Sequence, residues 1–190
     1  MTAAGRLRVI AGTARGRRLV APAGDAVRPT TDRVREALFS ALGDRVDGAR
    51  VLDLYAGSGA LAIEALSRGG DHAVLVERDR DAIDAVRQNL AATGFDDRAR
   101  VERADVARFV ARGTPAEPFS LVLIDPPYDE PAAAVAGVLA ALAQPGWLGP
   151  GATVVLERAA RSEPVGFPTS WRTGWQRTYG GTLVTVASAD

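Results

Sequence analysis

Apolar runs alternate with amphipathic segments along the chain from residue 50 onward. The runs have the length of buried strands, and the segments between them repeat their apolar positions at helical spacing. The predicted strands are 51–55, 72–77, 99–103, 119–125 and 152–157, and the predicted helices are 58–68, 80–94, 104–112 and 131–143. Strands that alternate with helices form a parallel sheet with helices on both faces, so the pattern predicts an α/β fold.

The C-terminal segment has a different pattern, because residues 171–188 show no helical period. They are predicted as two strands that turn at Tyr179–Gly180–Gly181. Such a hairpin adds antiparallel strands to one edge of the sheet.

The N-terminal segment also stands apart from the alternation. Residues 6–20 are predicted as two short strands around a turn, and 21–30 as a loop rich in proline and glycine. The run TTDRVREALFSALG predicts a helix that Thr30 or Thr31 caps and Gly43 ends.

Composition places the chain among ordinary soluble domains. It has 190 residues, 47% hydrophobic and 24% charged, which is enough for one domain with a small appendage. The chain has no cysteine, which excludes disulfides and thiolate metal sites and fits a reducing cytoplasm. No apolar run approaches the ~18 residues of a membrane span, and the N-terminus lacks the apolar core of a signal peptide. We therefore expect a cytoplasmic protein with no membrane contact and no metal.

The charge is unevenly distributed although it sums to zero. All 23 basic residues are arginine. The first twenty residues contain no acid and five of these arginines: Arg6, Arg8, Arg15, Arg17 and Arg18. The cluster indicates a contact with a polyanion, and the alternative is a solvated basic hairpin.

A cofactor site is predicted where the first strand meets its helix. Gly57 and Gly59 follow the strand directly, and glycine there lets a ligand approach the backbone at the carboxyl edge of the sheet. Asp53 and Glu77 stand at the ends of the first two strands, and an acid at the second position accepts ribose hydroxyls. Asp105 follows the third strand and is a candidate to reach an adenine amino group. The site is typical of a bound nucleoside.

Two other interpretations of these residues remain open. Asp53 and Glu77 are also suited to helix capping or to a surface salt bridge. Taken alone, the glycines and acids also fit a nicotinamide-dependent oxidoreductase.

The fourth strand ends in Asp125-Pro126-Pro127-Tyr128, the most specific motif in the chain. Two prolines cannot continue a central ladder, so the chain leaves the sheet in a stiff turn. An exocyclic amine on a base is a poor nucleophile, because its lone pair is delocalised into the ring. Two acceptors that grip its protons favour a tetrahedral nitrogen whose lone pair faces a methyl donor. Asp125 and the Pro126 carbonyl supply these acceptors, and Tyr128 stacks on the base.

This motif favours a methyltransferase that acts on a nucleic-acid base. The alternative, a rigid turn with no chemistry, leaves unexplained why the turn follows a strand whose end lies on the same predicted rim as Gly57 and Glu77.

Four segments together make the chain resemble a known family, the bacterial 16S ribosomal RNA guanine-N2 methyltransferases of the RsmD type. The resemblance covers nearly the whole length and is carried by RVIAGTARGRRLVAP, RPTTDRVREALFSAL, VLDLYAGSGALAIEALSRGG and DPPY. Tyr55 stands where the family often has Phe, and Ala62 where it often has Gly. Neither departure removes a group that the chemistry needs.

The resemblance implies a class I Rossmann-like methyltransferase fold, with a mostly parallel seven-stranded sheet, helices on both faces and an N-terminal β-hairpin extension. It divides the chain into the basic hairpin extension, 1–27, and the methyltransferase domain, 28–190. It implies a monomer that transfers methyl from S-adenosylmethionine, leaving S-adenosylhomocysteine, to N2 of a guanine in 16S rRNA. The expected substrate is an assembled or partly assembled 30S particle.

The resemblance also implies roles for individual residues. The target base is assigned to Asp125, Pro126, Pro127 and Tyr128; the cofactor to Arg28, Thr30, Asp53, Tyr55, Ala56, Gly57, Ser58, Gly59, Glu77, Arg78, Asp105 and Val106; and RNA phosphates to Arg6, Arg8, Arg15, Arg17 and Arg18.

The alternatives are a DNA adenine-N6 methyltransferase, which solves the same chemical problem, and a non-catalytic RNA-binding assembly factor. A sequence-reading DNA enzyme normally needs an extra recognition region, for which 190 residues leave little room.

Overall fold

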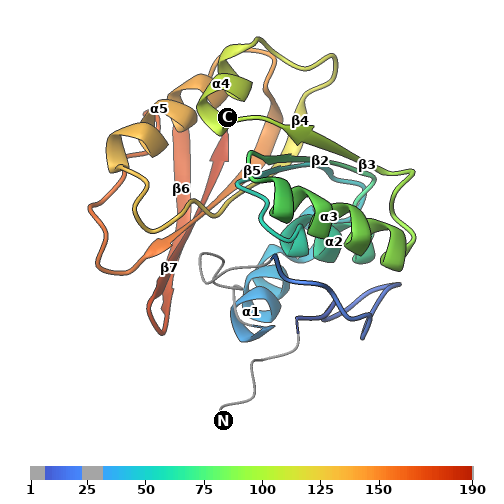
Figure 1. Cartoon of the computed structure of the whole chain (residues 1–190). Coiled ribbons are helices and arrows are strands. Elements are labelled where there is room, and N and C mark those ends of the chain that lie inside the picture. The colour runs from blue at the N-terminus through green and yellow to red at the C-terminus, as the bar shows by residue number, and fades with distance from the viewer. Residues whose placement is uncertain (1–6, 23–31, 190) are drawn as a thin grey trace.

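The structure is a computed structural model that describes residues 7–22 and 32–189. Its centre is a seven-stranded sheet in the order β3-β2-β1-β4-β5-β7-β6 (Figure 1). The strands are β1 (Arg50–Leu54), β2 (His72–Glu77), β3 (Ala99–Arg103), β4 (Phe119–Ile124), β5 (Leu148–Ala159), β6 (Trp171–Tyr179) and β7 (Thr182–Ala189). The strands β1 to β5 are parallel to one another, and β7 lies antiparallel between β5 and β6. The mostly parallel sheet and its closing hairpin are confirmed.

Helices cover both faces of the sheet, as predicted. They are α1 (Asp32–Leu42), α2 (Ala60–Ser67), α3 (Arg80–Thr93), α4 (Val106–Ala111) and α5 (Ala132–Leu142), with a short 3-10 helix, η1 (Gly43–Arg45), after α1. One core lies between the sheet and the helices α1 to α3, and the other between the sheet and α4 and α5. Of the helices that the structure describes, none is long and apolar enough to cross a membrane.

The strand β5 begins earlier than the predicted 152–157. Leu148 already pairs with Phe119, and the register then shifts between Phe119 and Leu121. A bulge of this kind interrupts the apolar pattern, so the sequence signal begins only after it.

The carboxyl ends of the central strands lie side by side. Leu54 of β1 pairs with Val76 of β2 and with Ile124 of β4, which in turn pairs with Leu156 of β5. The residues that follow these strands therefore gather on one rim of the sheet, the usual place for a ligand in an open α/β fold.

The two short strands predicted within 6–20 are shorter than expected in the residues that the structure describes. The segment does fold back on itself, but it forms a single antiparallel bridge, between Arg8 and Arg18. The helix α2 supplies the missing partners: Ile10 and Ala11 donate their N–H groups to Glu64, at 2.7 and 3.0 Å. The two arms of the segment also bond to each other, since Leu19 donates its N–H to the Leu7 carbonyl at 2.8 Å and Val9 donates to the Arg17 carbonyl at 3.0 Å. The facing backbone and the side chains of α2 thus share the work of satisfying this segment.

The N-terminal segment is part of the main core. Leu7, Val9, Ala14 and Leu19 are buried in the same cluster as α1 to α3. The division into 1–27 and 28–190 stays a prediction. The proposed caps Thr30 and Thr31 lie outside the described residues.

Candidate active site

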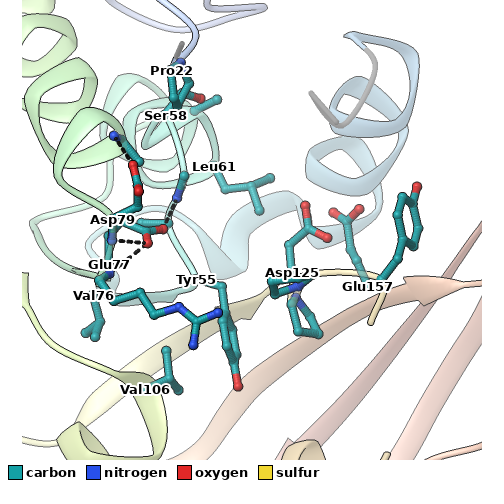
Figure 2. Close-up of a pocket in the computed structure, with 18 of the residues that line it drawn as sticks. Pro22, Tyr55, Ser58, Leu61, Val76, Glu77, Asp79, Val106, Asp125 and Glu157 are labelled. Atoms are coloured by element: carbon teal, nitrogen blue, oxygen red, sulfur yellow. Dashed lines mark hydrogen bonds between the residues drawn. The ribbon is translucent and has the colours of Figure 1, made fainter. Parts of the chain in front are cut away.

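A cavity of about 390 Å³ opens at the carboxyl rim of the sheet. That volume is in the usual range for a small-molecule site. Its walls come from the loop after β1, the end of β2, the start of α4, the turn after β4 and the end of β5 (Figure 2). Residues of the N-terminal segment, of α1, of the starts of α2 and α3, and of β7 complete the lining, so distant parts of the chain face one space.

The loop after β1 forms one wall through Tyr55, Ala56, Gly57 and Ser58. Gly57 has φ 55°, a left-handed conformation that glycine adopts freely. Tyr55 has φ 63° without being glycine, a strained conformation that is most often found at functional sites. Gly59, with φ 75°, is the N-cap of α2 and does not line the cavity.

Glu77 fixes the glycine loop to the end of β2. Its Oε2 accepts the N–H of Gly57 at 2.9 Å, and its Oε1 accepts those of Arg78 and Asp79 at 2.7 and 2.9 Å (Figure 2). A carboxylate offers about four lone-pair positions, so one stays available to a hydroxyl group that enters the cavity.

Asp105 has a similar double position at the start of α4. Its Oδ1 accepts the N–H of Arg108 at 3.1 Å and caps the helix, while its Oδ2 lies 3.8 Å from Nη1 of Arg78. Arg78, Asp105 and the buried Val106 all line the cavity. Asp105 therefore caps α4 and lines the cavity at the same time.

The structure places Asp53 beneath the cavity and not in its wall. The side chain is 1% exposed, and its Oδ2 accepts the N–H of Ala62 in α2 at 3.1 Å. Burial raises the pKa of Asp53 well above its usual value, and the charges of Asp125 and Glu77 add to this against the opposing Ala62 hydrogen bond. Asp53 thus holds the start of α2 against β1.

This raised pKa predicts how an Asp53→Asn variant behaves with pH. The folded state disfavours ionised Asp53, so the wild type loses stability as pH rises from the unfolded pKa of about 4 towards the higher folded pKa. The asparagine of the variant cannot ionise. We expect the melting temperature of the variant, relative to wild type, to rise as the pH is raised above about 4. A difference that is constant across this window would contradict the prediction.

The Asp-Pro-Pro-Tyr turn forms another wall, and Asp125, Pro126, Pro127 and Tyr128 all line the cavity. Tyr128 is 54% exposed, one of two large hydrophobic side chains so exposed among the described residues. Arg158 steadies the turn, because its Nη1 donates to the Glu130 carbonyl at 3.0 Å. The two predicted motifs therefore share one cavity.

The sequence reasoning missed two buried charged residues that line the cavity. Arg35 of α1 is fully buried, and its Nη2 donates to the Arg8 carbonyl and to Asp32, at 2.7 and 2.8 Å. Glu157, near the end of β5, is 1% exposed. The sequence does contain signals for both residues. Arg35 lies three residues before Leu38, so it falls on the buried face of its helix, and Glu157 ends an apolar strand in the same way as Glu77.

The predicted RNA contacts lie on the N-terminal segment. Arg15, Arg17 and Arg18 are exposed. Arg8 is exposed as well, and its Nε pairs with Asp32 at 3.1 Å. The predicted site residues Arg6, Arg28 and Thr30 lie outside the described residues.

Comparisons with known proteins place the chain in a family. A family model described as "Conserved hypothetical protein 95" matches residues 7–188. The chain belongs to this family. The Conserved hypothetical protein 95 match thus includes every described residue of the cavity wall.

Named relatives share much of the sequence. "Ribosomal RNA small subunit methyltransferase D" of Escherichia coli K12 is 38% identical over 168 residues, 88% of this chain and 82% of the relative. "Putative rRNA methyltransferase YlbH" of Bacillus subtilis is 46% identical over 125 residues, 65% of this chain and 68% of the relative.

A solved structure of similar fold, "Putative methyltransferase yhhF from Escherichia coli", superposes with a TM-score of 0.85 at 33% identity. The match covers 98% of this chain and 99% of the other. The class I Rossmann-like methyltransferase fold is confirmed.

Proposed function

We propose that this protein transfers a methyl group from S-adenosylmethionine to the exocyclic N2 amine of a guanine in 16S rRNA. The observation that carries the proposal is that the glycine loop and the Asp-Pro-Pro-Tyr turn line one cavity. A methyl donor and an amine acceptor held there are adjacent. The relatives named as small-subunit rRNA methyltransferases support the choice of substrate.

The cavity residues fit the parts of the cofactor. Tyr55 to Ser58 hold the methionine part, with the Gly57 backbone close to it. The free lone pair of Glu77 accepts a ribose hydroxyl. Asp105 receives the adenine amino group, and the buried Val106 packs on the ring. We assign supporting roles to three further residues. Arg78 lines the cavity beside Asp105, while Asp53 and Gly59 position the start of α2.

The reacting group needs positioning more than activation. S-adenosylmethionine supplies an electrophilic methyl group on a sulfonium. Asp125 and the Pro126 carbonyl accept the two amine protons and turn the nitrogen lone pair towards that methyl. Tyr128 stacks on the base and holds its plane. Asp125 is also the nearest acceptor for the proton that leaves.

The substrate is proposed to be an assembled or partly assembled 30S particle in the cytoplasm, bound by a monomer. A target base that is stacked or paired must be flipped into the cavity. Pro127 keeps the turn rigid, which gives the flipped base a fixed place to bind.

The test measures methyl transfer from tritiated S-adenosylmethionine to 30S particles that lack the modification, to free 16S rRNA and to duplex DNA. We expect incorporation into 30S particles, with N2-methylguanosine as the labelled nucleoside by mass spectrometry. Label in N6-methyladenosine of duplex DNA would favour the DNA enzyme. Binding to 30S particles without incorporation would favour an assembly factor. Stabilisation by NAD, and not by S-adenosylhomocysteine, would indicate the oxidoreductase.

The basic N-terminal segment is proposed to contact RNA phosphates. Replacing Arg15, Arg17 and Arg18 together by alanine is expected to weaken 30S binding and to reduce the slope of log K against log salt by roughly 0.7–0.9 for each phosphate that is no longer neutralised. The control removes the same charge from exposed arginines elsewhere: Arg45, Arg87 and Arg112. Equal reductions in both triple variants, measured at several salt concentrations, would argue against a localised RNA-binding surface.

A further inference from the structure

Glu157 stands beside Asp125 on the substrate side of the cavity. Ile124 and Leu156 are paired neighbours on the parallel strands β4 and β5, and Asp125 and Glu157 are the residues that follow them. Both line the cavity, and Figure 2 shows their carboxylates directed into the same space. The cavity thus presents two adjacent carboxylates where the target amine is proposed to bind.

The alternation of the strands fixes the direction of both side chains. Ile124 and Leu156 pack in the core on the α4 and α5 side, whereas Leu123 and Val155 pack on the α1 to α3 side. Successive side chains of a strand point to opposite faces, so Asp125 and Glu157 point towards the α1 side. The pair is therefore set by the sheet register and not by a mobile loop.

A buried cation lies close enough to Glu157 for their charges to interact. Arg35 of α1 is fully buried and lines the cavity, and its Nε and Nη1 have no hydrogen-bond partner among the described residues. Burial lowers the pKa of Arg35, while the charges of Asp32, Glu64 and Glu157 oppose this. The attraction is mutual, so Arg35 stabilises negative charge on Glu157. Two carboxylates can thus stay close together in a buried site.

We propose that Glu157 accepts the ring N1–H of the target guanine while Asp125 grips its N2 amine, which makes Glu157 the residue that selects guanine. This inference rests on the proposed function, because it deepens the choice of base at the same site. Guanine carries N1–H and the N2 amine side by side on its Watson–Crick edge. Two adjacent carboxylates match these two donors.

The same arrangement rejects the other amino bases. Adenine has an unprotonated N1 beside its N6 amine, and cytosine has an unprotonated N3 beside its N4 amine. A carboxylate at that place meets a ring lone pair, so acceptor faces acceptor and neither is satisfied. Sites built around a substrate N–H reject analogues that lack it far more strongly than they reject changes in size.

2-Aminopurine keeps the 2-amine of guanine but lacks both the proton on N1 and the O6 carbonyl. The loss of O6 is the same for every enzyme variant, so a change of preference between the wild type and Glu157→Gln reports on N1. The experiment first maps the methylated guanine in 16S rRNA from 30S particles treated with the wild type. A synthetic segment with guanine or 2-aminopurine at that position is then ligated into 16S rRNA, and 30S particles are reconstituted. Single-turnover methyl transfer is measured on both particles.

We expect the wild type to prefer guanine over 2-aminopurine by roughly 100-fold or more, and Glu157→Gln to reduce the preference to under about 10-fold. The amide that this substitution introduces donates to the bare N1 of 2-aminopurine or accepts from guanine, so it tolerates both. Glu157→Asp keeps the carboxylate and is expected to keep the guanine preference at a lower rate. Glu163→Gln, at an exposed carboxylate outside the cavity, is the matched control.

The outcomes separate the two claims. No N2-methylguanosine from the wild type on any particle overturns the proposed function itself. An active wild type whose preference persists in Glu157→Gln overturns the role of Glu157, even where both rates fall together, since that is the effect of a purely structural residue. The affinity for S-adenosylhomocysteine, measured by calorimetry, is expected to stay within about threefold, and a larger loss assigns Glu157 to the cofactor instead.

Discussion

Replacing Asp125 by alanine is expected to lower methyl transfer to 30S particles by about 10³-fold or more. The variant loses the side-chain acceptor that turns the amine lone pair towards the methyl donor. The residues proposed to bind the cofactor, Tyr55 to Ser58 and Glu77, are unchanged in this variant. The loss should therefore fall on the rate of transfer, with cofactor binding largely retained.

The measurement pairs a single-turnover assay with calorimetry using S-adenosylhomocysteine. Asp125→Asn keeps one acceptor oxygen in the same shape and is expected to fall between alanine and wild type. Asp129→Ala, at an exposed carboxylate in the same segment, is the matched control. Full activity of Asp125→Ala would show that the amine is not gripped in this way.

The fold was largely predictable because its signals are local. Four strands of the parallel part contain short apolar runs, and β3 alternates apolar and charged residues. The alternation of these strands with helical segments indicates the sheet and its two covered faces. The rule that ligands bind at the carboxyl ends of the strands then places Gly57, Glu77 and Asp125 on one rim. These residues do meet in one cavity.

The parts that failed depend on contacts between distant segments. The N-terminal segment folds back on itself with a single antiparallel bridge, because the N–H groups of Ile10 and Ala14 go to Glu64 and Ser67 of α2, more than fifty residues away. Asp53 shares the predicted rim with Glu77, yet the start of α2 covers it. Both results depend on how α2 packs on the sheet, which the sequence pattern does not specify.

Arg35 was missed for a related reason. In a helix pattern it is one charge among several, and only the packing of α1 on the sheet makes it a buried cation beside Glu157. A buried charge is costly unless an opposite charge compensates it. The carboxylates of Asp32, Glu64 and Glu157 provide that compensation for Arg35 only once the chain is folded.

Glu64 joins the N-terminal segment to the methyltransferase core. It is fully buried in α2 and accepts the N–H groups of Ile10 and Ala11. Its Oε1 also pairs with Nε of Arg68 at 2.7 Å. Removing this carboxylate leaves two backbone donors without an acceptor and one cation without its partner.

We therefore expect Glu64→Ala to destabilise the protein by about 3–5 kcal/mol, the usual cost of breaking a buried charged network from one side. In a domain of this size that lowers the melting temperature by roughly 10 °C. Calorimetry measures the shift, and hydrogen exchange at Ile10 and Ala11 shows whether the segment detaches first. Glu163→Ala, at an exposed carboxylate outside the core, is the control and should change the melting temperature little.

The same variant tests whether the segment carries RNA binding. Because Glu64 lies away from the cavity wall, S-adenosylhomocysteine affinity should persist below the lowered melting temperature. Affinity for 30S particles should fall with the loss of order in the segment that presents Arg15, Arg17 and Arg18. If 30S affinity stays at the wild-type value while exchange at Ile10 rises, the RNA contact lies on another surface of the protein.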